Sequence, residues 1–275
     1  MTTRPGLAQR ARRRAAGRWS DIRGLPRPRP LTANLKSKSA GLDLPREFPV
    51  RAYDELQALV MDRLAASTSL QREFNGAWNA VAYRFLAAAE LEVSLRRSIK
   101  KFGAAPPVDE RYRQERDLFA FFGNACSVLD SLAYALYALN ADRHLHEFPL
   151  TTRDDRQNVG FFPTKDLYTI YFPDQAITHQ LVSVASSAEF DEMRRLRSVL
   201  VNRSSTSRNV DQGGEVDSSV VSDGPHLDHR TELEPAVIAR SRAWVAEALR
   251  ALVPAALEFA RDDPPAAATQ TEVAG

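Results

Sequence analysis

The sequence predicts an all-α fold, a single helical bundle of about five or six helices over residues 45–262. Apolar side chains recur at helical spacing along three long segments, which begin near Phe74, Leu118 and Leu233, and in the first two the steps alternate between four and three residues. This period matches one face of a helix and does not match a strand. Leu and Ala are abundant and β-branched runs are short, which also favours helix. With 44% hydrophobic and 26% charged residues, the chain has the composition of a globular domain.

The first 44 residues are predicted to form a disordered basic arm, rich in Arg and Pro. Residues 1–40 contain nine Arg and two Lys against Asp21 alone, a net charge of +10, so the rest of the chain carries −8 within an overall +2. Few large apolar residues are available there to offset chain entropy. Clustered arginines suit a nucleic-acid-binding arm, and a merely solvated tail is the alternative. The centre of the basic block is Arg12, Arg13 and Arg14.

Two helices are expected in the first half of the bundle. The first runs from Arg51 to about Ala65, after the helix breaker Pro49. The second follows a Ser cap at residue 67 or 69 and ends at Gly103, because Gly commonly follows the last residue of a helix. Its apolar stripe consists of Phe74, Trp78, Val81, Phe85, Ala88, Leu95, Ile99 and Phe102, interrupted by Glu92, which is interpreted as an ion-pair partner of an Arg or as the edge of the stripe.

The third helix begins after Pro106-Pro107 and carries the most regular stripe, so we expect it at the centre of the core. The stripe consists of Leu118, Phe122, Ala125, Leu129, Leu132, Leu136 and Leu139. A polar flank runs beside it and is interpreted either as a cleft or subunit contact, or as hydroxyls that bond locally. The flank consists of Ser127, Asp130, Ser131, Tyr134 and Tyr137.

The second half is predicted to contain shorter helices and one long one. A short helix is expected over 164–170, and another over 174–186 leads into the helix that carries Arg197. Residues 202–230 are rich in Ser, Asp and Gly and are predicted to be an exposed loop. A last helix over 231–261 precedes a disordered tail, residues 263–275.

The run from Arg194 to Arg208 carries the clearest functional signal. Its core, Leu196-Arg-Ser-Val-Leu-Val-Asn-Arg203, resembles the signature of the HEPN family, in which an Arg, a polar residue, a short spacer and a His follow one another. Arg197 and Ser198 match this pattern, and Asn202 stands in the position of the His. Three further segments are similar to a subgroup of HEPN-like bacterial proteins, namely residues 74–85, 122–137 and 242–252.

The resemblance implies a homodimer in which the motif lies near a helix end and faces RNA. The family chemistry is attack of a ribose 2′-OH on the adjacent phosphate, without metal or cofactor. That reaction needs a proton acceptor near neutral pH, which imidazole provides and the carboxamide of Asn202 does not. The resemblance therefore implies an RNA-associated binding or regulatory protein with an inactive ribonuclease site, in a defence or toxin–antitoxin setting. The degenerate site is Arg197, Ser198 and Asn202, and the expected RNA contacts are Arg203, Arg208 and the arm residues Arg12, Arg13 and Arg14.

Two alternatives remain open. One is an active metal-independent endoribonuclease in which His226 or His229 replaces the missing base. The other is a purely structural dimer, in which Arg197 stabilises a helix end and pairs with an acid such as Asp191 or Glu192.

Other classes of function are disfavoured. The single cysteine, Cys126, falls in a leucine stripe, so we expect neither a metal site nor a reactive thiol. The chain has no phosphate-binding glycine loop or dinucleotide motif, so no cofactor is expected. We also expect no membrane span or secretory segment, and a cytoplasmic location.

Overall fold

We describe the protein from a computed structural model. The described backbone covers residues 34–103, 106–202, 207–210, 216–222, 230–232 and 235–262, and side chains are described for these residues except 201–235. Arg12, Arg13, Arg14, most of the predicted arm and the predicted tail therefore lie outside the described residues.

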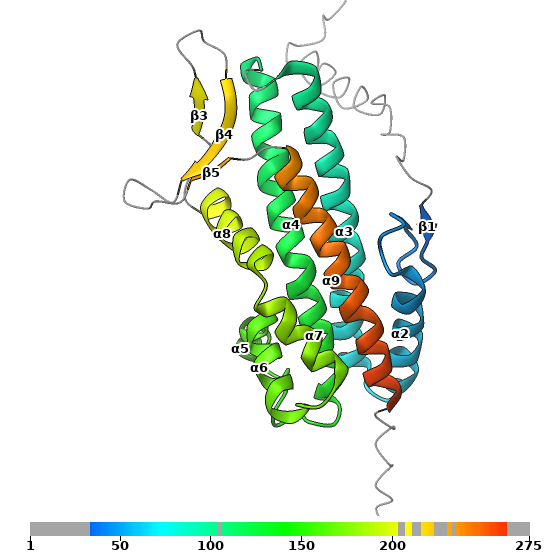
Figure 1. Cartoon of the computed structure of the whole chain (residues 1–275). Helices are drawn as coiled ribbons and strands as arrows, with labels where there is room; N and C mark the ends of the chain where they lie inside the picture. The colour runs from blue at the N-terminus through cyan, green and yellow to red at the C-terminus, as the bar shows by residue number, and fades with distance from the viewer. Residues whose placement is uncertain are drawn as a thin grey trace, which may run out of the picture. The chain divides into compact units, whose positions relative to one another are not determined.

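Two long antiparallel helices form the centre of the bundle, as the apolar stripes predict. They are α3 (Thr68–Phe102) and α4 (Val108–Ala141), which pack along most of their lengths (Figure 1). All seven stripe positions of α4 are buried, as are those of α3 from Phe74 to Leu95. Gly103 ends α3 at a φ of 69°, in a region that side chains rarely adopt. The predicted all-α class is confirmed.

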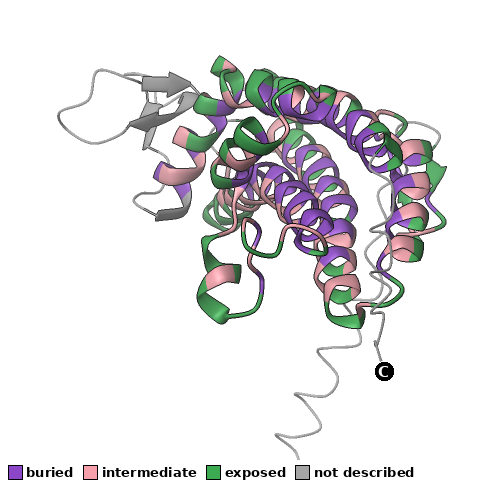
Figure 2. Cartoon of the chain, turned by 90° about the horizontal axis from the view of Figure 1, so that it is seen from below, coloured by how far each residue is buried: buried purple, intermediate pink, exposed green. Residues whose placement is uncertain are grey.

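Two further helices cover this pair. They are α2 (Val50–Arg63), close to its predicted range, and α9 (Pro235–Asp262), which packs against α2, α3 and α7. Figure 2 shows the buried sides of the long helices turned toward one another. The predicted start of the last helix at Thr231 is wrong, because residues 230–232 form a strand and Pro235 occupies the first helical turn, where its missing N–H costs nothing.

Four shorter helices complete the described helical part. They are α5 (Arg153–Asn158), α6 (Phe161–Tyr171), α7 (Ala176–Ala185) and α8 (Ala188–Asn202). The described residues thus hold eight helices, more than the five or six predicted. The missed helix α5 has no buried residue and therefore no apolar period; a capping box between Thr152 and Asp155 defines its start.

Two small antiparallel sheets correct the sequence interpretation. Strands β1 (Leu35–Lys36) and β2 (Asp43–Leu44) form a hairpin in which Leu44 is fully buried, so the folded part begins before the predicted end of the arm at residue 44. Strands β3 (Ser207–Val210), β4 (Val216–Ser222) and β5 (Arg230–Glu232) pair in that order within the segment predicted to be a loop. Strands β1, β2, β3 and β5 have two to four residues, too few to show a clear period, and the seven residues of β4 do not alternate between apolar and polar.

One described helix, α4, is long and apolar enough to cross a membrane by length and composition. More than half of its most apolar window is buried inside the bundle. A core helix of a globular protein passes the same test, so the absence of a membrane span stays a prediction.

Candidate nucleic-acid interface

Arg197 lies on the flank of α8, beside the row of side chains that α8 buries in the core. The buried row is Phe190, Met193, Leu196, Val199 and Leu200. From this flank, Arg197 Nη1 lies 3.7 Å from Asp130 Oδ2 on α4, with 43% of the Arg197 side chain and 45% of the Asp130 side chain exposed. The partner is thus a member of the polar flank of α4. The two acids considered from sequence are paired elsewhere on α8, Asp191 with Arg194 and Glu192 with Arg195.

The ion pair between Arg197 and Asp130 leaves much of the guanidinium open. A separation of 3.7 Å exceeds hydrogen-bond length, so the contact is electrostatic. No hydrogen bond of Arg197 to another described residue accompanies it. The half-buried Ser198 follows on the next position of α8. Arg197 therefore retains N–H donors for an oxygen ligand that arrives from solvent.

Cys126 lies close to Arg197 and Asp130 and is buried. It is 2% exposed. Burial raises the pKa of the thiol to about 12, and the effects of Arg197, which lowers the pKa, and of Asp130, which raises it, are smaller. A raised pKa favours the protonated thiol at neutral pH, in line with the burial that the leucine stripe predicts.

Asn202 and Arg197 do not share one side of α8. The helix continues without interruption through residue 202, and positions five residues apart are separated by about 140° around the axis. Within one chain the motif positions therefore diverge, and they can meet only if a second copy provides one of them. The side chain of Asn202 lies outside the described residues, as do Arg203, His226 and His229. Arg208 belongs to β3, of which only the backbone is described.

An aromatic cluster lies on one side of the neighbouring Arg194, and sequence reasoning did not find it. The rings of Phe162 and Phe190 stack with centroids 5.8 Å apart and an angle of 9° between their planes. Phe190 also stacks on Trp244, at 5.7 Å and 18°. Arg194 Cζ lies over the Phe162 ring, 4.3 Å from its centroid. Only the spacing of Phe190 and Arg194, four residues apart, was visible in the sequence; the other two rings come from α6 and α9.

The remaining polar flank of α4 is partly occupied by structural contacts. The Tyr134 hydroxyl donates to Glu73 Oε2 at 2.8 Å, and Arg156 Nε lies 2.8 Å from Glu73 Oε1. Burial, more than the adjacent Glu73, raises the pKa of Tyr134. This triad ties α5 to α3 and α4, so Tyr134 serves packing, whereas Asp130 faces α8.

Glu92 forms a buried ion pair with an Arg, one of its two predicted roles. Its Oε2 lies 2.6 Å from Arg242 Nε of α9, and its Oε1 lies 3.6 Å from Arg96. Arg242 also pairs with Glu47, just before α2. The cluster holds α9 against α3 and contains none of the motif residues.

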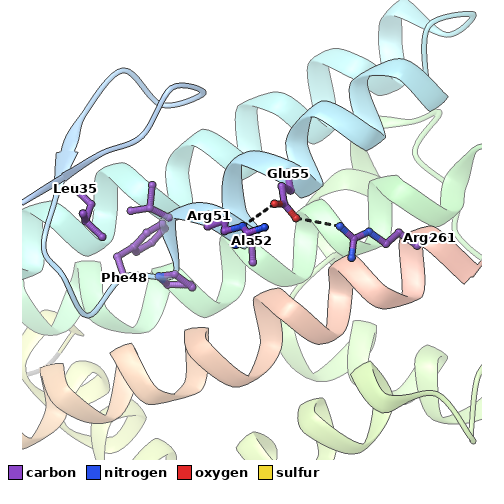
Figure 3. Close-up of a pocket in the computed structure, with 8 residues that line it drawn as sticks. Leu35, Phe48, Arg51, Ala52, Glu55 and Arg261 are labelled. Atoms are coloured by element: carbon purple, nitrogen blue, oxygen red, sulfur yellow. Dashed lines mark hydrogen bonds and ion pairs between the residues drawn. The ribbon is translucent and has the colours of Figure 1, made fainter.

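The described surface also has a shallow, open depression of about 500 Å³ beside α2. Figure 3 shows Leu35 and Phe48 at one end, and Glu55 between Arg51 and Arg261 at the other. Both arginines lie 3.0 Å from Glu55, so their charges are shared with this carboxylate. The depression does not include any residue of the Arg197 motif.

Among the side chains that the structure describes, no group of three or more His, Cys, Asp or Glu is arranged to hold a metal ion. Comparison of the chain with protein-family models, with curated protein sequences and with solved structures finds no match.

Proposed function

We propose that this protein is a HEPN-like, RNA-associated binding or regulatory protein whose ribonuclease site is degenerate and inactive. The observation that supports it is the position of Arg197, which is half-exposed on α8 and held near Asp130 at a distance too long for a hydrogen bond. A guanidinium in this state can donate two N–H groups to a phosphate. The choice of RNA as the ligand comes from the resemblance of residues 196–203 to the HEPN signature.

Binding is favoured over catalysis by the groups that accompany Arg197. Its described electrostatic partners are the carboxylate of Asp130 and the buried thiol of Cys126, and Ser198 is the next residue along α8. None of them is an imidazole, and the motif position that carries His in the family carries Asn202 here. A carboxamide can orient a ligand by hydrogen bonds but cannot take up a proton from a 2′-OH.

Titration of the full-length protein into a labelled single-stranded RNA, followed by fluorescence anisotropy at several salt concentrations, tests the proposal. Affinity should fall as salt rises, because phosphate contacts release counterions. Arg197→Ala should weaken binding by about 10- to 100-fold, which corresponds to the free energy of one charged hydrogen bond. It should also reduce the slope of log affinity against log salt concentration by about one. The matched control is Arg195→Ala, which removes the same charge from another side of α8. Binding that is absent or insensitive to salt would favour the purely structural dimer.

The basic arm is tested in the same assay with the full chain. Replacing Arg12, Arg13 and Arg14 by Ser should reduce the salt slope if the arm contacts phosphates. An unchanged slope would identify the arm as a solvated tail and would leave the contribution of Arg197 unaffected.

The degenerate motif is tested by restoring the missing base. Asn202→His should create RNA cleavage in EDTA, with a gain of about 10²- to 10⁴-fold from a positioned acid–base group, and Arg197→Ala should abolish the gain. Because the two positions diverge on α8, the gain should require two chains. Mixing the variant Arg197→Ala/Asn202→His with wild type should therefore produce cleavage that neither protein shows alone.

Two outcomes would contradict this part of the proposal. An Asn202→His protein that is folded, dimeric and silent would remove the support for a lost ribonuclease site. Wild-type cleavage that Arg197→Ala abolishes would instead support the active-enzyme alternative, and His226→Ala and His229→Ala would then identify the substitute base.

A further inference from the structure

Phe190 of the aromatic cluster lies in the same row of α8 as Arg194 and the motif residue Arg197. Phe190, Arg194 and Arg197 follow one another at spacings of four and three, which places them on one flank of the helix. Side chains at such spacings lie about 5–6 Å apart at their Cβ atoms. Arg194 and Arg197 are therefore neighbours on the surface of α8: the guanidinium of Arg194 lies over the Phe162 ring of α6, and that of Arg197 lies near Asp130 of α4.

Both arginines are available for a ligand. The Arg194 side chain is 49% exposed and its Nη1 lies 3.8 Å from Asp191, so this pair, like that of Arg197 and Asp130, is longer than a hydrogen bond. By contrast, Arg195 on another side of the same helix donates two hydrogen bonds to Glu192, at 2.8 and 2.9 Å. Among the residues whose side chains the structure describes, no carboxylate is hydrogen-bonded to Arg194 or Arg197.

The aromatic side chains next to Arg194 are partly exposed and held in place. Phe162 and Trp244 are half-buried, and the fully packed Phe190 lies between them in the stack. The three rings come from α6, α8 and α9, so their orientation is fixed by the packing of three helices. Fixed aromatic rings and guanidinium planes are the groups on which proteins stack unpaired bases.

We propose that this flank recognises single-stranded RNA, by stacking one unpaired base on the surface formed by Arg194 and Phe162 and binding the adjacent phosphate with Arg197. The inference rests on the proposed RNA-binding function and specifies its ligand. In a duplex each base is already stacked between its neighbours and paired, so its face is not available to Arg194. The same two arginines on a duplex would contact phosphates only, without gain from the ring.

Arg194→Lys is the decisive variant, because it keeps the charge and removes the planar group. Its matched control is Arg195→Lys, the same change one position along α8. The probes are a labelled single-stranded oligoadenylate, an abasic ribose-phosphate oligomer of equal length, and an RNA duplex. Wild type should bind the oligoadenylate more tightly than the abasic oligomer. Arg194→Lys should weaken oligoadenylate binding by about 5- to 100-fold, the value of one stacked base, without changing the salt slope or the affinity for the other two probes.

Phe162→Leu provides a second variant, since it keeps an apolar side chain and removes the ring. It should reproduce the selective loss on oligoadenylate, with circular dichroism confirming the fold. Equal wild-type affinity for the oligoadenylate and the abasic oligomer would overturn the inference, as would an Arg194→Lys variant that binds all probes like wild type or loses all equally. In those cases salt-dependent binding through Arg197 would still support the proposed function. Failure of wild type to bind any probe would overturn both.

Discussion

Glu92 lies inside the bundle with 4% of its surface exposed, where a carboxylate is costly without a partner. Burial raises the pKa of Glu92, and the nearby Arg96 opposes this effect. Arg242, whose own pKa is lowered by burial, meets the carboxylate at 2.6 Å. The two charges depend on each other, so removal of one should cost more than removal of both.

Replacing Arg242 by Met should lower the free energy of unfolding by about 3 kcal/mol at pH 7, the cost of breaking a buried ion pair. A carboxyl whose folded pKa is raised binds its proton more tightly in the folded state. The variant should therefore lose stability as pH rises above the unfolded pKa of about 4.3, and its deficit relative to wild type should be smaller at pH 5 than at pH 7. Urea unfolding at both pH values measures this.

The double variant Glu92→Leu/Arg242→Met is the control, and it should recover part of the loss, because an apolar pair can replace a buried ion pair at little cost, whereas Glu47 still loses its contact with Arg242. A deficit of the single variant that is equal at both pH values, or a double variant less stable than Arg242→Met, would contradict this account.

The pKa of Asp54 is shifted downward, opposite to the pKa of Glu92. Burial by itself raises the pKa of Asp54, but hydrogen bonds from the Ser37 and Ser39 hydroxyls and from the backbone N–H groups of Lys38 and Ser39 outweigh it and hold the pKa below its usual value. The carboxylate thereby fixes the turn between β1 and β2 on α2.

Asp54→Asn should lower the free energy of unfolding by about 1 kcal/mol at pH 7. The loss is smaller than for a buried charged hydrogen bond, because solvent screens the partly exposed carboxylate. A lowered folded pKa contributes stability above the unfolded pKa of about 3.9, and this contribution is lost as pH falls through the folded pKa. The difference between wild type and variant should therefore disappear in acid. A difference that persists unchanged at pH 3 in chemical denaturation would show that the carboxylate charge is not responsible.

At the scale of elements, the end of α3 is set by Gly103. Its backbone N–H donates to the Ile99 carbonyl at 2.8 Å, and its φ of 69° with ψ of −166° belongs to a region that is nearly restricted to glycine. A Cβ at this position would meet open space, so the strain is confined to the backbone.

Gly103→Ala should therefore lower the free energy of unfolding by about 1–3 kcal/mol. Gly123→Ala is the matched change inside α4, where a Cβ also meets open space, and it should instead stabilise the protein by up to about 1 kcal/mol through helix propensity. Thermal unfolding of both variants measures the contrast. If both variants changed the melting temperature in the same direction, the backbone conformation of Gly103 would not be the cause.

Elements also differ in how far the sequence revealed them. The long stripes of α3 and α4 predicted both helices and their buried faces, because each turn of such a helix repeats the same pattern. The exposed helix α5 has no buried residue, four of the five strands have at most four residues, and β4 does not alternate between apolar and polar, so none of them shows a period. Their formation depends on a capping box or on pairing with the next strand along the chain.

At the scale of the whole molecule, we expect a homodimer that includes the Arg197 flank of α8. The expectation comes from the HEPN resemblance, from the divergence of positions 197 and 202 on one helix, and from the half-exposed flank of α4 that contains Asp130. Light scattering at tens of micromolar should give twice the mass of one chain. A monomeric mass would contradict the dimer and, with it, a composite site from two chains.

The sequence by itself determined the fold class, the two central helices, the glycine end of α3 and the burial of Cys126, because these follow from local periodicity and backbone preference. It also singled out Arg197, by a motif. Only the tertiary structure decided that Arg197 meets Asp130 of α4, that Glu92 meets Arg242, and that Phe162, Phe190 and Trp244 gather beside Arg194. Helical period gives the face that is buried but not the neighbour that buries it. That neighbour depends on how the helices pack and rotate against one another, which is decided by the whole core at once.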